Sequence, residues 1–255
     1  MNAFDDFVAG HKPALPYLPL AHTCAGKSFR AVLAKNTLSP APCSVYTGED
    51  LLYFFYGRPA YRTDGRGRST SDYECFPVSM IVRPEAVTPL KRIAPFDTGA
   101  FSKGMFHDYI LATTTCDEFL VTPVLDTAAK LVSAFHENSR KYLLGEPLST
   151  LGPSPCKGVQ CYHKMISNKD ETAFDERRST IEFQTESHVG LTGGNVKLVV
   201  MPAPWLDDSS VVAKLTAEWM AEIRTYFTSH SPPNEYISAI REYVYGYYRR
   251  EGHLR

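Results

Sequence analysis

The stretch LLYFFYGRPAYR, residues 51–62, places basic and aromatic side chains directly after a strand-like apolar run. Arg58 and Arg62 carry guanidinium groups, which bind phosphate oxygens through charge-assisted hydrogen bonds. Tyr56 or Tyr61 offers an aromatic face on which a flat ring can stack. These residue types suit a ligand that combines phosphates with an aromatic ring. The alternative is a rigid turn at a strand end whose arginines pair with surface carboxylates.

A glycine and a proline lie among these groups. Gly57 allows the backbone to turn or to approach a ligand closely, and Pro59 stiffens the turn. The preceding strand, Leu51–Tyr56, would hold the turn in position. The sequence therefore predicts a strand whose end presents groups for ring stacking and phosphate binding.

A second candidate lies where the strand in YLPLAHT is expected to end, at His22 and Thr23. The imidazole of His22 can bind a ligand, but a histidine at a strand end can also be a satisfied core residue. The segment GKSFRAVLAKNTLSP, which follows, has apolar residues at helical spacing, with Asn36 and Pro40 to close the helix.

A third candidate is Glu182, in the alternating segment STIEFQTES. Ile181 and Phe183 would point to one side of a strand, and Glu182 and Gln184 to the other. The polar side of such a strand is either a solvated sheet face or the wall of a cleft.

Familiar site motifs are absent. No GxGxxG follows a strand, and GxxxxGK[ST], HExxH and GxSxG do not occur, which removes the commonest nucleotide-binding, metalloprotease and serine-hydrolase signatures. CKGVQCYH offers Cys156, Cys161 and His163 as three zinc ligands. Because no second pair has finger-like spacing, we expect a loop with two free thiols and no metal.

The rest of the chain supplies the elements that must position these groups. In chain order, the patterns predict an extended lead-in over 1–16, a strand within 73–82, a helix over 126–146, an irregular surface excursion or lid over 146–176, a strand in NVKLVVMP and a helical C-terminal part over 206–255. This order lacks regular alternation of strands and helices, so it favours a mixed α+β fold in one domain, 1–255.

Composition excludes several classes of protein. The chain has 255 residues, of which 44% are hydrophobic, and 27 basic against 28 acidic residues give a net charge of −1. This balance provides no long-range attraction to nucleic acid or to an anionic membrane. An acidic N-terminus and the lack of an apolar run of about 20 residues argue against a signal peptide or membrane span. With six irregularly spaced cysteines, we expect a cytoplasmic protein with reduced thiols.

The candidate groups occur in a familiar order. LAHT, a helix, LLYFFYG, a long middle, STIEFQ and NVKLVVMP together resemble the ADP-ribosyltransferase fold, in the branch with a His–Tyr–Glu triad. In that branch the first core strand ends in His and a small polar residue, a tyrosine-bearing strand comes next, and the catalytic glutamate opens a later strand. The resemblance covers roughly residues 15–205 and is strongest over 18–62 and 179–202.

The resemblance implies mixed sheets around an NAD cleft with flanking helices. His22 would hydrogen-bond the adenosine ribose of NAD, and Glu182 would be the catalytic carboxylate. The segment FYGRPAYR differs from the usual sequence of the family at this place. The identity of the ring-stacking tyrosine therefore stays open among Tyr53, Tyr56 and Tyr61. The NAD-binding set implied in this way is His22, Thr23, Tyr53, Tyr56, Gly57, Arg58, Tyr61 and Arg62, with His22, Tyr56 and Glu182 as the catalytic set.

The expected activity is transfer of ADP-ribose from NAD, the co-substrate, to a macromolecular acceptor, either protein, RNA or DNA. Members of this class inside bacteria often act as toxins or in antiphage defence, which implies an antitoxin or inhibitor protein as a further partner, and no membrane. Two other readings stay open: a non-catalytic nucleotide- or nucleic-acid-binding module that uses the YGRPAYR turn, and a partner-binding protein whose aromatic C-terminal helix docks on another chain.

The segment RIAPFDTGAFSKGMFHDY, residues 92–109, has no assigned role. Asp97 and Gly99 could form a turn beside the pocket, and a plain loop explains them equally well.

Overall fold

The computed structural model describes residues 2–60, 68–110, 113–152, 156–168 and 176–254 of the chain. Tyr61 and Arg62, two of the predicted NAD-binding residues, lie outside these ranges.

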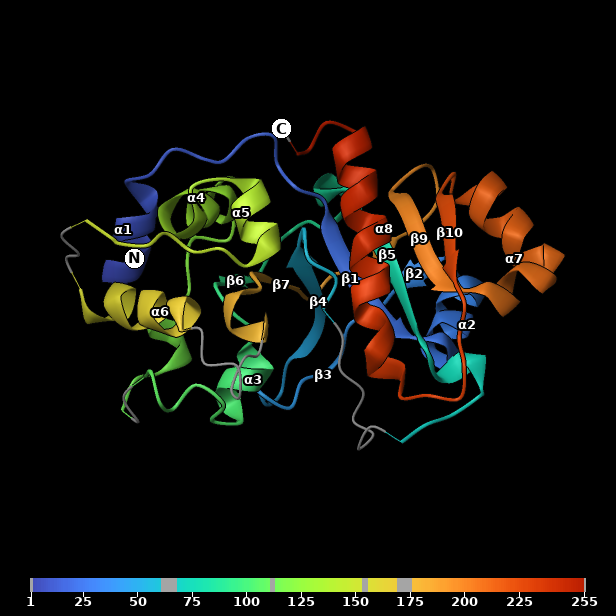
Figure 1. The fold of residues 1–255 in the computed structure, drawn as a ribbon, viewed down its shortest axis with the longest axis horizontal. Coiled ribbons are helices and arrows are strands. Elements are labelled where there is room, and N and C mark those ends of the chain that lie inside the picture. Colours follow the sequence, from blue (N-terminus) through green and yellow to red (C-terminus); the bar gives the residue numbers. More distant parts are fainter. Residues whose placement is uncertain (1, 61–67, 111–112, 153–155, 169–175, 255) are drawn as a thin grey trace.

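The described residues form a mixed α and β structure around a large sheet (Figure 1). Its strands follow the order β10-β9-β5-β1-β4-β7-β6, with β3 paired to β4. β9 and β10 are parallel, and the other pairs are antiparallel. The strands of this sheet are β1 Leu20–Ala25, β3 Ala41–Pro42, β4 Asp50–Tyr56, β5 Pro77–Val82, β6 Arg92–Ala94, β7 Glu182–Thr185, β9 Val196–Pro202 and β10 Glu222–Tyr226. β2 Thr37–Leu38 and β8 Val189–Gly190 form a separate small pair.

Helices gather at both ends of the sheet, and one helix packs across it (Figure 1). α1, α4, α5 and α6 group together near β6 and β7, whereas α2 and α7 lie near β9 and β10. α8 packs against β5, β9 and β10. The helices are α1 Ala3–Ala9, α2 Gly26–Lys35, α3 Thr98–Ser102, α4 Leu125–His136, α5 Ser139–Leu144, α6 Lys157–Ser167, α7 Ser209–Ala213 and α8 Ile237–Arg250.

Several predicted elements are confirmed. β4 covers the apolar run that begins at Leu51, β9 covers NVKLVVMP, and α2 follows LAHT as expected. Asn36 closes α2 in the left-handed conformation, with φ of 53°, which asparagine tolerates better than most residues. β1 does not end at His22 and Thr23 but runs to Ala25, because it pairs with β5 along its whole length.

The lead-in over 1–16 is not wholly extended, because α1 occupies its first part. The Asn2 side chain caps α1 by accepting the N–H of Asp5, at 2.8 Å. Phe4 and Val8, four residues apart, share one face and are buried. The prediction of an extended lead-in was based on the prolines later in this segment. It missed the short amphipathic stretch that precedes them.

The C-terminal part over 206–255 is not wholly helical either. α7 passes into a π-helical turn at Lys214–Glu218, and Met220 then takes a positive φ of 58° that ends the helix. β10 follows and pairs with β9. The helix predicted for this part is therefore interrupted by a strand, and Phe227, which directly follows the strand, is 89% exposed. The open edge of β9 offers backbone partners that outweigh local helix preference.

The helix predicted over 126–146 is two helices. Glu137 has a φ of 71°, which breaks the helical path between α4 and α5. Asn138 then caps α5 by accepting the N–H of Lys141, and Gly145 ends it in the left-handed conformation. Both residues that bound α5, Asn138 and Gly145, can be recognised in the sequence. Asn138, inside the predicted helix, marks the break between α4 and α5.

The stretch 146–176 is not simply a surface excursion, because α6 forms within it. Val159, Tyr162 and Met165 from α6 are buried, and the Tyr162 hydroxyl donates to the Pro95 carbonyl at 2.9 Å. The helix therefore belongs to the core.

A candidate active site around Glu182

A cavity of about 270 Å³ opens beside β4 and β7. Its walls combine strand residues with two loop segments, one before β4 and one at the start of α3. The lining residues are Pro42, Cys43, Ser44, Val45, Tyr53, Phe55, Asp97, Gly99 and Glu182. Glu182 and Tyr53 come from the predicted site, and the turn at Asp97 and Gly99 does lie beside it.

Strand register explains why these side chains meet. In the ladder between β4 and β7, Phe55 pairs with Glu182 and Tyr53 pairs with Gln184. Directly opposed residues of antiparallel strands point to the same face of a sheet. Tyr53, Phe55, Glu182 and Gln184 therefore share the face on which the cavity lies.

Three donors hold the Glu182 carboxyl group, which is 2% exposed. The Thr98 hydroxyl donates to Oε1 at 2.7 Å, and the Gln184 amide donates to the same oxygen at 2.7 Å. The Thr98 N–H donates to Oε2 at 3.2 Å. The polar side of the strand is therefore the wall of a cleft and not a solvated face.

Burial changes the protonation of Glu182. Loss of hydration, and then the nearby charge of Asp97, raise the pKa of Glu182 to about 8, although the hydrogen bonds from Gln184 and Thr98 oppose this shift. At neutral pH, much of the population carries a protonated Glu182. A carboxyl group with such a pKa beside a cavity is typical of a functional site.

A chain of polar contacts leads from Glu182 toward the surface. Arg92, which pairs with Gln184 in the ladder between β6 and β7, donates to the Gln184 side-chain oxygen at 3.3 Å. Its guanidinium also makes two hydrogen bonds to Glu49, at 2.6 and 2.7 Å, and lies 4.1 Å from the centre of the Tyr46 ring. Arg92 therefore orients Gln184, which in turn orients Glu182.

Sequence reasoning missed Thr98, Arg92 and Cys43. Gln184 could be found because it shares the polar face of its strand with Glu182. Thr98 and Arg92 lie in the segment 92–109, and no pattern there signals that it folds back onto β7.

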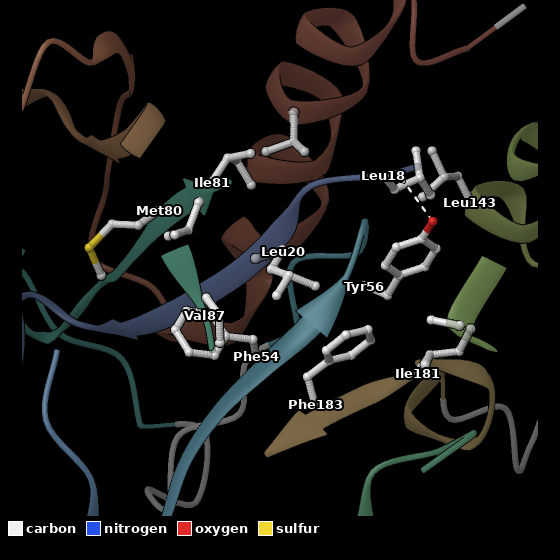
Figure 2. Packing of buried hydrophobic residues seen from close by; sticks show 14 of the residues in the cluster. Leu18, Leu20, Phe54, Tyr56, Met80, Ile81, Val87, Leu143, Ile181 and Phe183 are labelled. Carbon is white, nitrogen blue, oxygen red and sulfur yellow. Dashed lines mark hydrogen bonds between the residues drawn. The ribbon is translucent and has the colours of Figure 1, made fainter. Parts of the chain in front are cut away.

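Tyr56 lies in the core and not in the cavity (Figure 2). Its hydroxyl accepts the N–H of Leu18 at 2.9 Å, and its ring stacks on Phe183, with the centroids 5.9 Å apart. As a neighbour of Phe55 along β4, Tyr56 points to the opposite face from Glu182. The predicted role of Tyr56 at the nicotinamide is therefore corrected: its ring is fully buried among apolar side chains.

Gly57 and Arg58 have structural contacts instead of an exposed, ligand-facing position. Gly57 has a φ of 66°, and a Cβ atom there would lie 2.5 Å from the Leu18 side chain. Arg58 is 3% exposed, and its guanidinium donates to the Ser179 hydroxyl at 2.8 Å and to the Leu143 carbonyl at 3.3 Å. The predicted phosphate-binding role of Arg58 is corrected, because its donors are committed inside the protein.

His22 and Thr23 do not line the cavity. The ladder between β1 and β4 has two residue pairs, and the second joins Ala21 and Phe55. His22 is the next residue along β1 and points to the other face, where its ring centroid lies 5.5 Å from that of Phe54. Its Nδ1 lies 2.8 Å from the Tyr53 carbonyl, and burial lowers its pKa. Thr23 donates to Ser79 at 3.0 Å. The structure does not bring His22 together with Glu182.

The candidate zinc ligands also have other roles. Cys156 directly precedes α6, Cys161 lies within this helix, and Nε2 of His163 is 2.7 Å from the Leu148 carbonyl oxygen. Across the ranges that the structure covers, no group of three or more histidine, cysteine or acidic side chains could hold a metal ion.

Within these same ranges, no helix has both the length and the apolar character needed to cross a membrane. No family model matches the chain, and no curated protein matches it in sequence.

Proposed function

We propose that this chain is an NAD-dependent ADP-ribosyltransferase in which Glu182 is the catalytic carboxylate. The observation that carries the proposal is a buried glutamate on β7, between β4 and β6, held by three donors at a cavity lined by Tyr53 and Phe55.

The chemistry requires these groups. Cleavage of the bond between nicotinamide and ribose develops oxocarbenium charge on the sugar, as in glycoside hydrolysis. A fixed carboxylate stabilises that charge where it forms. Among the described residues, Oε2 of Glu182 accepts one hydrogen bond, from the Thr98 N–H. A carboxylate oxygen accepts two, so Oε2 retains capacity for a sugar hydroxyl.

We assign the proposed ring-stacking role to Tyr53. Of the three tyrosines considered, Tyr56 is in the core and Tyr61 lies outside the described residues, whereas Tyr53 lines the cavity. Phe55 offers a second aromatic ring on the same wall. These rings would fix the orientation of the leaving nicotinamide.

The cavity suits only part of NAD. Its volume of about 270 Å³ is just below the range of roughly 300–1,000 Å³ of small-molecule pockets. The reacting end, nicotinamide with its ribose, would occupy the cavity, and the adenosine half would lie outside it. The acceptor of ADP-ribose, protein or nucleic acid, is best identified by labelling cell extract with labelled NAD.

No observation favours the alternative of a binding module that uses the YGRPAYR turn. Its described polar groups, Tyr56 and Arg58, are buried and bonded within the protein.

The test is nicotinamide release from NAD by wild type and by Glu182→Gln. We expect the variant to release nicotinamide at least about a hundredfold more slowly, since removing one transition-state contact of this kind costs that much. Glu186→Gln is the matched control, because Glu186 is exposed, lies just beyond the same strand and pairs with Lys91. Near-wild-type release by Glu182→Gln would contradict the proposal.

A further inference from the structure

A second cavity, of about 450 Å³, shares no lining residue with the Glu182 cavity. Three parts of the chain meet there: the lead-in after α1, the junction of α4 with α5, and the C-terminal end after α8 (Figure 1). Hydrogen bonds hold these parts together. The Ala14 N–H donates to the Ala129 carbonyl at 3.0 Å, and Nδ1 of His253 lies 3.1 Å from the Tyr17 carbonyl oxygen.

The wall of this cavity includes a serine whose buried hydroxyl group has no partner. Ser139 is 7% exposed, and its Oγ makes no hydrogen bond to any described residue. Buried polar groups are nearly always hydrogen-bonded, in many cases to a bound water or ion. His136, Trp205 and Tyr248 also carry a buried polar atom without a partner among the described residues, but they line neither cavity. At Ser139, by contrast, a ligand in the cavity can supply the missing partner.

The charged residues around the cavity favour an anion. Lys12 and Arg140 line it, and neither makes an ion pair or a side-chain hydrogen bond with a described residue. The acidic residue of the wall, Glu137, pairs with Lys141, four residues further along. Burial lowers the pKa of His253, so its ring is neutral at neutral pH and adds no charge. The wall therefore carries two positive charges that no described carboxylate balances.

The neutral groups of the wall indicate what kind of anion fits. Oδ1 of Asn138 accepts the N–H of Lys141, which leaves the amide N–H groups of Asn138 as further donors. Guanidinium, ammonium, hydroxyl and amide donors suit the several oxygens of a phosphate group better than the two of a carboxylate. Pro13 and Leu15 add an apolar surface. A volume of about 450 Å³ lies within the range of roughly 300–1,000 Å³ of small-molecule pockets, so the cavity has room for more than the phosphate.

We propose that this cavity is a binding site for a small organic phosphate, whose phosphate group is held by Arg140, Lys12 and the Ser139 hydroxyl. The organic part lies against the apolar surface of the lead-in. The ligand joins the lead-in, the junction of α4 with α5 and the C-terminal end, so its binding stabilises the folded protein. This site does not rest on the proposed reaction at Glu182.

Isothermal titration in phosphate-free buffer of low ionic strength tests the site, with phenyl phosphate and inorganic phosphate as the probes. We expect phenyl phosphate to bind about tenfold more tightly than inorganic phosphate, because its ring covers apolar surface. Equal affinity for the two probes would overturn the place assigned to the organic part. If neither probe produced heat of binding, the whole proposal would fail.

Three variants locate the binding. Arg140→Gln should weaken phenyl phosphate binding at least about tenfold, as the loss of one charge-assisted contact predicts. Arg83→Gln is the matched control, because Arg83 is also exposed but lines neither cavity. Glu182→Gln should bind phenyl phosphate as wild type does, whether or not it has lost nicotinamide release. Weakening by Glu182→Gln, or equal affinity of the Arg140 and Arg83 variants, would overturn the site.

Ser139→Ala separates binding from folding. The substitution removes a buried hydroxyl that has no described partner, so without a ligand the variant should be at least as stable to heat as wild type. Its affinity for phenyl phosphate should nevertheless fall about tenfold, because the phosphate loses one donor. A variant that is less stable without a ligand and binds phenyl phosphate normally would contradict the role of Ser139.

Discussion

At the scale of single residues, the proposed chemistry depends on the position of one carboxyl group. Glu182 is removed from water by its strand neighbours and held by Thr98 and Gln184. The same burial that positions the carboxyl group also raises its pKa to about 8. Catalysis and stability should therefore both respond to pH in the neutral range, in ways that trace to Glu182.

Nicotinamide release should increase with pH between 6 and 9. The proposed mechanism uses the ionised form of Glu182, and that form is the minority below the pKa of about 8. We expect kcat/KM for NAD to rise about tenfold per pH unit well below this pKa and to level off above it. A rate that falls as pH rises would show that Glu182 acts in its protonated form, as a general acid.

The stability of the fold should decrease as pH rises, whereas the rate of nicotinamide release should increase. The pKa of Glu182 in the folded state, about 8, lies above the ordinary value of 4.5. The folded state therefore holds the proton more tightly, and the contribution to stability that is present below pH 4.5 is lost as pH rises through 8. At about 1.4 kcal/mol per pH unit, this loss is on the order of several kcal/mol.

Glu182→Gln isolates this contribution, because an amide does not titrate. The variant loses the acceptor for the Thr98 N–H, so it should be about 1 kcal/mol less stable than wild type near pH 5. Near pH 9 the ionised wild type should be the less stable of the two. Urea unfolding of both proteins at both pH values tests this reversal of their relative stability. If the free energy of unfolding depended on pH in the same way in both proteins, that result would contradict the role of Glu182.

At the scale of elements, the turn after β4 is a structural joint. Gly57 takes a positive φ that lets its N–H donate to the Pro19 carbonyl at 2.8 Å, and Arg58 reaches across to Ser179 and Leu143. The guanidinium also lies 4.8 Å from the centre of the Tyr142 ring. The turn thereby ties β4 to α5 and to the segment that leads into β7.

Arg58→Met should therefore destabilise the protein without weakening the binding of NAD. Methionine keeps the buried stem but leaves the Ser179 hydroxyl and the Leu143 carbonyl without their charged donor. We expect a loss of about 2–4 kcal/mol in the free energy of unfolding, and an unchanged KM for NAD in the folded fraction. Weaker NAD binding at unchanged stability would restore the phosphate-binding role predicted from the sequence.

At the scale of the whole molecule, the C-terminal segment completes the sheet that carries the site. β10 extends the sheet beside β9, and α8 packs Ile240, Val244 and Tyr248 into the core. The C-terminal part is thus continuous with the rest of the fold and not a separate helical unit.

Ile240→Ala should lower the stability of the entire protein in one cooperative transition. Ile240 is fully buried, and removing such a side chain costs about 2–5 kcal/mol. Tyr243→Ala, on the same helix but 38% exposed, is the matched control and should cost much less. Thermal unfolding followed by two probes, the far-UV signal and tryptophan fluorescence, would reveal a second transition if the C-terminal part unfolded alone.

Local patterns in the sequence determined the mixed α and β class, the strands around Phe54 and Val199, the helix after LAHT, and the alternation that singled out Glu182. They could do so because apolar periodicity and capping residues act within a few positions. The tertiary structure decided which polar residues meet. It turned Tyr56 and Arg58 into the core, placed His22 on the other face from Glu182, and brought Thr98 and Arg92 to β7. Strand register and long-range pairing set these outcomes, and a shift of one residue would exchange the two faces of the sheet.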